Sequence, residues 1–351
     1  MKSLISSIFI ILHTTLTTGL PQSTPPTEPF YPETGHSNDN GGIFGVGIDI
    51  LTSGFISLDK ISGTLGLGSE FPPLSELLPG VSDIITSNAS PGGTGPYPAR
   101  WFANPELPHH TIYAPATPPP SDVTLPVVIW GNGFCLNIGN LFQPFLQEIA
   151  SHGYLVVASG PPLPKIVMNP LQLLTTTGLQ SKSIQLTQAI DFVYAGGAAQ
   201  YGNIDISRLA AAGQSCGGQE AYSASYHDPR VVLTMLFNSG VFIPARRYLL
   251  NELTAPVAYF VGGDIDLGHE VSLADYAVLP EGLPSVWSSL DTGHAGTYFA
   301  ENGGKDAIAA VTFLEWWFRG DEAAKRAFTD PSSLGSLASE GWNITWKNVN
   351  V

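Results

Sequence analysis

From residue 110 onward the chain alternates short apolar runs with amphipathic stretches, and this alternation limits the possible folds more than any other feature. Runs that are apolar at consecutive positions are typical of parallel strands covered by helices on both faces. We therefore predict an α/β fold, a doubly wound and mostly parallel sheet flanked by helices. The predicted strands are 110–113, 125–130, 154–158, 209–213, 231–237, 257–261 and 286–290, and the predicted helices are 141–151, 181–195, 217–226, 245–253 and 306–318.

Composition excludes several classes of protein. The formal net charge of −15 repels nucleic-acid phosphates and anionic lipid head groups, so we expect no nucleic-acid partner. Two cysteines are too few for a disulfide scaffold or a Cys-rich zinc site, and no repeat is visible. The 38 glycines and 29 prolines predict a loop-rich globular protein.

A candidate nucleophile lies between a predicted strand and a predicted helix. Gly213, Ser215 and Gly217 form the pattern Gly-x-Ser-x-Gly at this junction. A sharp turn there holds the serine in a strained conformation, and the two glycines allow neighbouring segments to approach closely. The start of the following helix favours developing negative charge. These features predict that Ser215 is a nucleophile, whereas a simple glycine-rich turn is the alternative.

A serine hydroxyl needs a base to remove its proton. Among the eight histidines, His294 is the best placed, because it lies in a loop of small residues after the last predicted strand. The small neighbours leave space for the imidazole over the nucleophile. A loop histidine without a function is the alternative.

The third residue of such an arrangement is a carboxylate that orients the imidazole. The predicted strand 257–261 runs into a turn that holds Asp264 and Asp266. We favour Asp266, because it lies deeper in the loop, whereas Asp264 follows a glycine pair and is suited to fixing the turn. A calcium site of the EF-hand type is disfavoured, because His269 stands where that loop needs glycine. No metal and no organic cofactor are implied.

Acyl transfer also needs N–H donors for the oxyanion. The predicted strand 125–130 ends in a glycine-flanked turn, where backbone N–H groups can point inward without Cβ clashes. We predict that the N–H group of Gly133 or Phe134 acts with that of Cys216, the residue after the candidate nucleophile. A plain tight turn is the alternative.

The chain order Ser215, Asp266, His294, with the serine in the turn 213–217, resembles the α/β-hydrolase superfamily. The resemblance covers residues 95–328. More narrowly, the chain resembles a group of secreted fungal α/β-hydrolases whose layout is similar to the dienelactone hydrolase and cutinase-like polyester hydrolase branches. In those relatives the carboxylate lies a few residues past the glycine pair, which favours Asp266. One departure is Gly131-Asn132 in place of the His-Gly pair of many esterases. The motifs that carry the resemblance are Trp130-Gly131-Asn132-Gly133, Ala150-Ser151-His152-Gly153-Tyr154, Gly213-Gln214-Ser215-Cys216-Gly217-Gly218, Gly262-Gly263 with Asp266, and Gly293-His294-Ala295-Gly296-Thr297-Tyr298.

The resemblance also implies a position for the two cysteines. In an α/β-hydrolase sheet the strands ending at Trp130 and Gly213 are neighbours, so Cys135 and Cys216 emerge side by side. Their Cα atoms can then lie within the roughly 4.4–6.8 Å that a disulfide needs. We predict that they are bonded, with two buried thiols as the alternative.

The N-terminal segments carry sorting and linking signals. Residues 1–19 have a basic start, an apolar stretch and small residues before Gly19, as in a secretory signal peptide. The apolar stretch is shorter than the roughly 20 residues that span a bilayer, which disfavours an anchor. We predict a secreted, extracellular protein without a membrane span in its mature chain. The other predicted parts are a flexible leader at 20–42, an N-terminal extension packing on the core at 43–95, a catalytic domain at 96–351, and glycosylation acceptors at Asn88 and Asn343.

Together these features predict a secreted, monomeric serine hydrolase that cleaves carboxylic esters through an acyl-enzyme. Only 12% of the residues are charged, which favours an uncharged ester, small or polymeric, as the substrate. A peptidase or lactonase on the same fold is one alternative, because pocket shape decides the leaving group. A catalytically silent binding protein of the same fold is the other.

Overall fold

In the computed structural model, which describes residues 91–163, 180–333 and 335–349, nine strands form one sheet in the order β1-β2-β4-β3-β5-β6-β7-β8-β9. The six strands from β4 to β8 in this order are parallel, whereas β1, β2 and β9 run antiparallel at the two edges. The strands are β1 (Ala99–Phe102), β2 (His110–Pro115), β3 (Thr124–Gly131), β4 (Leu155–Ser159), β5 (Asn203–Gln214), β6 (Leu233–Phe237), β7 (Val257–Val261), β8 (Ser285–Ser289) and β9 (Asn343–Lys347).

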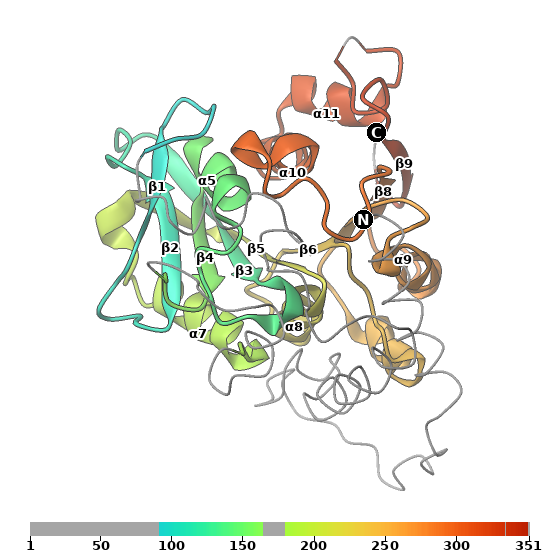
Figure 1. The fold of residues 1–351 in the computed structure, drawn as a ribbon, viewed down its shortest axis with the longest axis horizontal. Coiled ribbons are helices and arrows are strands. Elements are labelled where there is room, and N and C mark those ends of the chain that lie inside the picture. Colours follow the sequence, from blue (N-terminus) through green and yellow to red (C-terminus); the bar gives the residue numbers. More distant parts are fainter. Residues whose placement is uncertain (1–90, 164–179, 334, 350–351) are drawn as a thin grey trace, which may run out of the picture.

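Helices cover both faces of this sheet, so the predicted α/β class with a mostly parallel sheet is confirmed (Figure 1). One face packs against α5 (Gln143–Ser151), α10 (Gly304–Arg319) and α11 (Glu322–Thr329). The other packs against α7 (Ser183–Tyr194), α8 (Cys216–Ser225) and α9 (Leu267–Val278). Short 3₁₀ segments lie in the connections between these elements: η2 (Gly133–Cys135), η3 (Ala199–Tyr201), η4 (Pro244–Glu252) and η5 (Glu301–Gly303).

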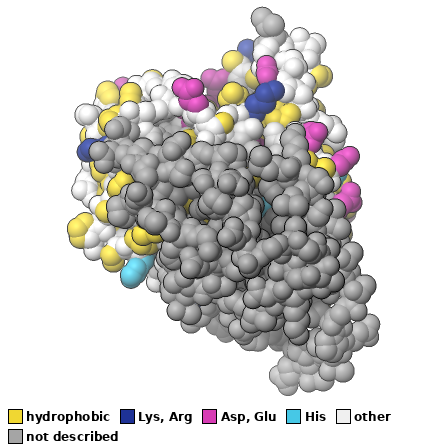
Figure 2. All heavy atoms as spheres, in the orientation of Figure 1, with side chains coloured by type: hydrophobic (Ala, Val, Ile, Leu, Met, Phe, Trp, Pro, Cys, Tyr) yellow, Lys and Arg dark blue, Asp and Glu magenta, His cyan; other side chains and the backbone are white. Residues whose placement is uncertain are grey.

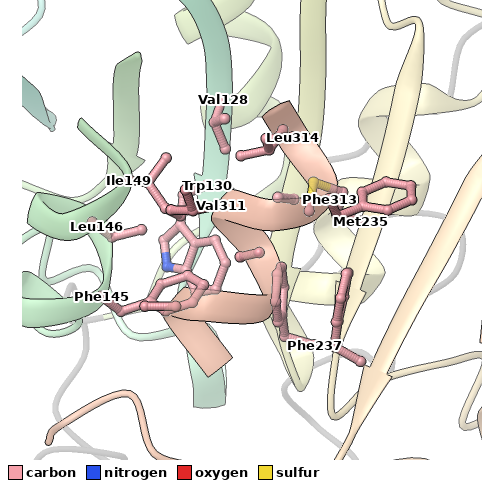
Figure 3. Packing of buried hydrophobic residues seen from close by; sticks show 14 of the residues in the cluster. Val128, Trp130, Phe145, Leu146, Ile149, Met235, Phe237, Val311, Phe313 and Leu314 are labelled. Carbon is pink, nitrogen blue, oxygen red and sulfur yellow. The ribbon is translucent and has the colours of Figure 1, made fainter. Parts of the chain in front are cut away.

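Strand β3 illustrates how one apolar run serves two cores. Val128 and Trp130 belong to the core beneath α5 and α10, whereas Val127 and Ile129 belong to the core beneath α7 and α8. Successive side chains of a strand point to opposite faces, so a strand covered on both sides must be apolar throughout. The Trp130 ring lies 5.2 Å from that of Phe145 and joins the first core (Figure 3).

The sheet has a switch point between β3 and β5. From β3 the chain continues to β4 on one side, and later strands are added beyond β5 on the other side. In open α/β sheets, ligands bind outside the carboxyl ends of the strands at such a point. The predicted oxyanion turn follows β3, and the predicted nucleophile follows β5.

The structure also departs from the predicted elements. The predicted helix 245–253 is a 3₁₀ segment, in which only Leu249 and Leu250 are buried, so it has no apolar stripe to pack as an α-helix. The sequence interpretation missed α9, α11 and the edge strands β1 and β9. The β9 residues are exposed or half-buried, so this strand lacks the apolar run that predicts a strand.

Most of the N-terminal predictions concern residues outside the described ranges. The predicted signal peptide, the leader, Asn88 and most of the 43–95 extension lie outside the described residues. The last residues of that extension do pack on the core, because the Thr94 N–H donates to Glu148 and the Gly95 N–H donates to Ser151 of α5.

The described surface agrees with the low charge density of the sequence. On the face in Figure 2, acidic side chains are scattered among uncharged ones, and Lys and Arg are sparse. Asn343 is exposed on β9, and its glycosylation stays a prediction. Among the helices of the described residues, none has the length and apolar character to cross a membrane.

Candidate active site

The serine turn, residues 213–217, joins β5 to α8. Ser215 has φ 54° and ψ −119°, a left-handed conformation that is strained for a residue with a Cβ. A Cβ added to Gly213 would lie 2.2 Å from the Gly217 carbonyl oxygen, and one added to Gly217 would lie 2.1 Å from the Gly131 backbone. The strained serine between two closely packed glycines, which the sequence predicts, is therefore present.

His294 contacts both partners that the sequence assigns to it. Its Nε2 lies 3.0 Å from Ser215 Oγ, and its Nδ1 lies 2.6 Å from Asp266 Oδ1. With the proton on Nδ1, the imidazole donates to Asp266 and accepts from the serine hydroxyl. These three residues follow β5, β7 and β8, so the structure brings the predicted Ser, His and Asp together at one edge of the sheet.

Asp266 is buried among donors. It caps α9 by accepting from the Gly268 N–H at 2.9 Å, and it also accepts from the Gly262 N–H at 2.8 Å. Burial alone raises the pKa of this carboxyl, but the hydrogen bond from His294 and the two backbone donors outweigh burial and hold the pKa below its usual value. Asp266 is therefore ionised at neutral pH.

Asp264 has a different environment. Its side chain is 96% exposed, and its Oδ1 lies 3.6 Å from His269 Nε2. Asp266, and not Asp264, thus forms the contact with His294.

The glycine turn, residues 131–135, follows β3 and contains the predicted oxyanion donors. Its shape depends on Asn132, whose amide donates to the Leu136 carbonyl at 3.0 Å and to the Ser159 carbonyl at 2.7 Å. Phe134 and Cys135 both adopt left-handed φ angles, 57° and 51°. The side chain of Asn132 therefore shapes the turn.

The predicted donors differ in their surroundings. The Cys216 N–H begins α8, where a helix has no preceding carbonyl for its first amides. Gly133 packs against Gln214, since a Cβ on Gly133 would lie 2.0 Å from Gln214 Oε1. Gln214 in turn donates to the His294 carbonyl at 2.9 Å. The role of Gly133, Phe134 and Cys216 as oxyanion donors stays a prediction.

The predicted disulfide between Cys135 and Cys216 is confirmed. Their Cα atoms are 5.2 Å apart, and the two cysteines are separated by 81 positions. Both are buried. The bond ties the glycine turn to the serine turn, beside the residue that follows Ser215.

Sequence reasoning missed two residues directly after β6. Asn238 donates to Asp266 Oδ2 at 2.8 Å, and the hydroxyl of Ser239 donates to the Ser215 carbonyl at 2.6 Å. The available signal was their place after an apolar strand, at the same sheet edge as the other candidates.

Glu220 is a buried carboxyl behind the serine turn. Its Oε1 accepts from Ser181 Oγ at 2.8 Å, whereas its Oε2 has no hydrogen-bond partner among the described residues. Oε2 lies beneath Gly131, where a Cβ would be 2.9 Å away. Burial raises the pKa of Glu220 to about 8, so this carboxyl is protonated at neutral pH.

Within the described ranges, no group of three or more His, Cys, Asp or Glu side chains is arranged to hold a metal ion. Protein-family models and curated protein sequences contain no match to this chain.

Removing the disulfide should destabilise the protein. We expect the double variant Cys135→Ser, Cys216→Ser to lose roughly 4 kcal/mol of unfolding free energy, because the bond closes a long loop in the unfolded chain. Denaturant unfolding of parent and variant measures this difference, and a reductant should weaken the parent but not the variant. Two free thiols per chain in the denatured, unreduced parent would contradict the assignment.

Glu220 should make stability depend on pH. Its folded-state pKa lies above the unfolded value, so its contribution is complete below about pH 4.5 and is lost as the pH rises toward 8. We expect Glu220→Gln to gain about 1 kcal/mol per pH unit relative to the parent between pH 5 and 8, levelling off above. Unfolding titrations across this range test it, with exposed Glu281→Gln as the control. A difference that does not vary with pH would refute the assignment.

Proposed function

We propose that this chain is a serine hydrolase of the α/β-hydrolase type that cleaves carboxylic esters through an acyl-enzyme. The observation that carries the proposal is the continuous hydrogen-bonded series from Asp266 through His294 to Ser215. Three side chains from three strand ends meet in the arrangement that activates a serine hydroxyl.

In the first half of the reaction, Ser215 Oγ attacks the ester carbonyl carbon as His294 Nε2 takes the hydroxyl proton. Asp266 stabilises the imidazolium, and its buried carboxylate is held in place by backbone donors. The negative charge on the carbonyl oxygen is stabilised by N–H groups at the start of α8 and in the glycine turn. His294 then gives its proton to the leaving-group oxygen as the ester C–O bond breaks, so the alcohol departs and the acyl group stays on Ser215.

In the second half, water replaces the alcohol. His294 removes a proton from the water, the resulting hydroxide attacks the acyl carbon, and the proton returns to Ser215 Oγ as the acid departs. The same groups thus act in reverse order. The disulfide between the glycine turn and the serine turn keeps the proposed oxyanion donors at a fixed separation through both steps.

The disulfide and the net charge support a location and a substrate class. A disulfide persists in an oxidising compartment, which supports secretion of an extracellular protein. The net charge of −15 disfavours anionic substrates, which supports an uncharged ester, small or polymeric. The complete series of three side chains favours an enzyme over a silent binding protein.

One pair of assays tests both the nucleophile and the type of bond that is cleaved. We expect the parent protein to hydrolyse short p-nitrophenyl esters but not the matching p-nitroanilides, and Ser215→Ala to lower ester hydrolysis by about 10⁴-fold or more. Spectrophotometric assays measure both rates, and circular dichroism checks that the variant folds.

A covalent probe supplies the control for that assay. A fluorophosphonate should label the parent once and leave Ser215→Ala unlabelled, whereas Ser207→Ala, in the first half of β5, should label as the parent does. Activity within tenfold of the parent in Ser215→Ala would exclude the proposed nucleophile. Faster cleavage of the anilides would instead indicate a peptidase.

The two aspartates provide a matched pair for the orienting carboxylate. Asp266→Asn should lower kcat by about 10³- to 10⁴-fold, because the amide favours the wrong imidazole tautomer. Asp264→Asn should leave kcat within about threefold, since its side chain is 96% exposed and away from His294. Steady-state kinetics on the same ester decide between them, and the opposite ranking would assign the role to Asp264.

A further inference from the structure

Asn238 occupies a backbone position that suits few residues. It follows β6 directly, and its φ of 49° is left-handed. Its N–H donates to the Phe260 carbonyl at 2.7 Å, which fixes the backbone between β6 and β7. Asparagine tolerates this conformation better than most residues, and glycine would adopt it without strain. What glycine would not supply here is the side-chain amide.

The amide of Asn238 contacts groups on both sides of His294. Its Nδ2 donates to Asp266 Oδ2 at 2.8 Å and points toward the Gly293 carbonyl at 3.3 Å, and its Oδ1 accepts from the Tyr298 hydroxyl. These partners determine the amide orientation, because a carboxylate and a carbonyl only accept and the phenol is the donor. Burial raises the pKa of Tyr298 well above its usual value, so the hydroxyl keeps its proton.

One side chain thus fixes two things that the proposed mechanism needs. Through Asp266 it holds the carboxylate whose other oxygen accepts from His294. Through Gly293 and Tyr298 it holds the histidine loop, residues 291–298, before and after the imidazole. Asn238, Tyr298 and Asp266 are all buried, so water does not compete for these bonds.

We infer that Asn238, supported by Tyr298, is a positioning residue that sets the orientation of His294 relative to Ser215. This inference rests on the proposed ester hydrolysis. Asn238 acts through Asp266 and the histidine loop and does not touch the reacting atoms. Loss of its amide should leave substrate binding unchanged and slow the chemical steps.

The test uses Asn238→Gly, which can adopt the same left-handed backbone and removes the side chain that carries the amide. We expect kcat for a p-nitrophenyl ester to fall about 10- to 100-fold with KM within about threefold. The acid limb of the kcat/KM profile should move to higher pH, because Asp266 loses a donor and interacts more strongly with the imidazolium. Tyr298→Phe, which deletes one hydroxyl, should lower kcat and move the acid limb in the same directions, but by less.

The control is Asn302→Gly, at another left-handed asparagine, in η5. Rates are expressed per active site titrated with a fluorophosphonate, so a fold defect lowers the number of sites but not the rate of each. If Asn238→Gly and Tyr298→Phe both match Asn302→Gly in kcat per site and in the acid limb, the inference is wrong. Failure of Asn238→Gly to fold leaves Tyr298→Phe to decide.

A second readout does not depend on ester hydrolysis. The Nδ1 proton of His294, in its short bond to Asp266, should give a far-downfield proton resonance in the parent that broadens in Asn238→Gly and persists in Asn302→Gly. An inactive parent with this pattern would refute the proposed function while supporting the positioning role. An unchanged resonance in Asn238→Gly would refute the positioning role itself.

Discussion

The close contact between the start of α8 and the end of β3 determines how this site is built. Gly131 and Gly217 meet backbone to backbone, and a Cβ on Gly217 would lie only 2.1 Å from Gly131. This contact places the serine turn against the glycine turn. It brings Cys135 and Cys216 within bonding distance and sets the Cys216 N–H beside the turn that follows β3. A larger side chain at either glycine would separate the two turns and, with them, the candidate oxyanion donors.

Backbone strain gathers at the same edge of the sheet. Of the seven non-glycine residues with left-handed φ in the described ranges, four belong to the site: Phe134, Cys135, Ser215 and Asn238. Such conformations persist where the surrounding contacts over-determine them. Here the Ser215 N–H donates to the Phe237 carbonyl, and the Asn238 N–H donates to the Phe260 carbonyl, so these two strained residues are held by the neighbouring strands. The parallel sheet therefore supplies the rigidity that the strained turns require.

The sequence could predict those parts of the fold and site that depend on local pattern. Buried strands show as apolar runs, and Ser215, Asp266 and His294 each follow one of them. The Gly-x-Ser-x-Gly pattern singled out the serine, and the place after a strand singled out the aspartate and the histidine. Helix α9 was missed because its buried residues, Gly268, Ser272 and Asp275, form no apolar stripe. The role of Asn238 was missed because its partner Tyr298 is 60 residues away, and no pattern within one segment encodes that contact.

The electrostatics of the site depend on which buried carboxyls stay charged. Burial raises the pKa of Asp306 to about 6 and that of Glu220 to about 8, although each accepts a hydrogen bond from a hydroxyl. Asp266 is comparably buried, but its bond to His294, with the backbone donors of Gly262 and Gly268, holds its pKa below the usual value. At neutral pH, Glu220 behind the serine turn is therefore neutral, while Asp266 beneath the imidazole is charged. In the proposed mechanism, negative charge is then concentrated where the imidazolium would form, and the neutral Glu220 adds no charge to oppose the oxyanion at the serine turn.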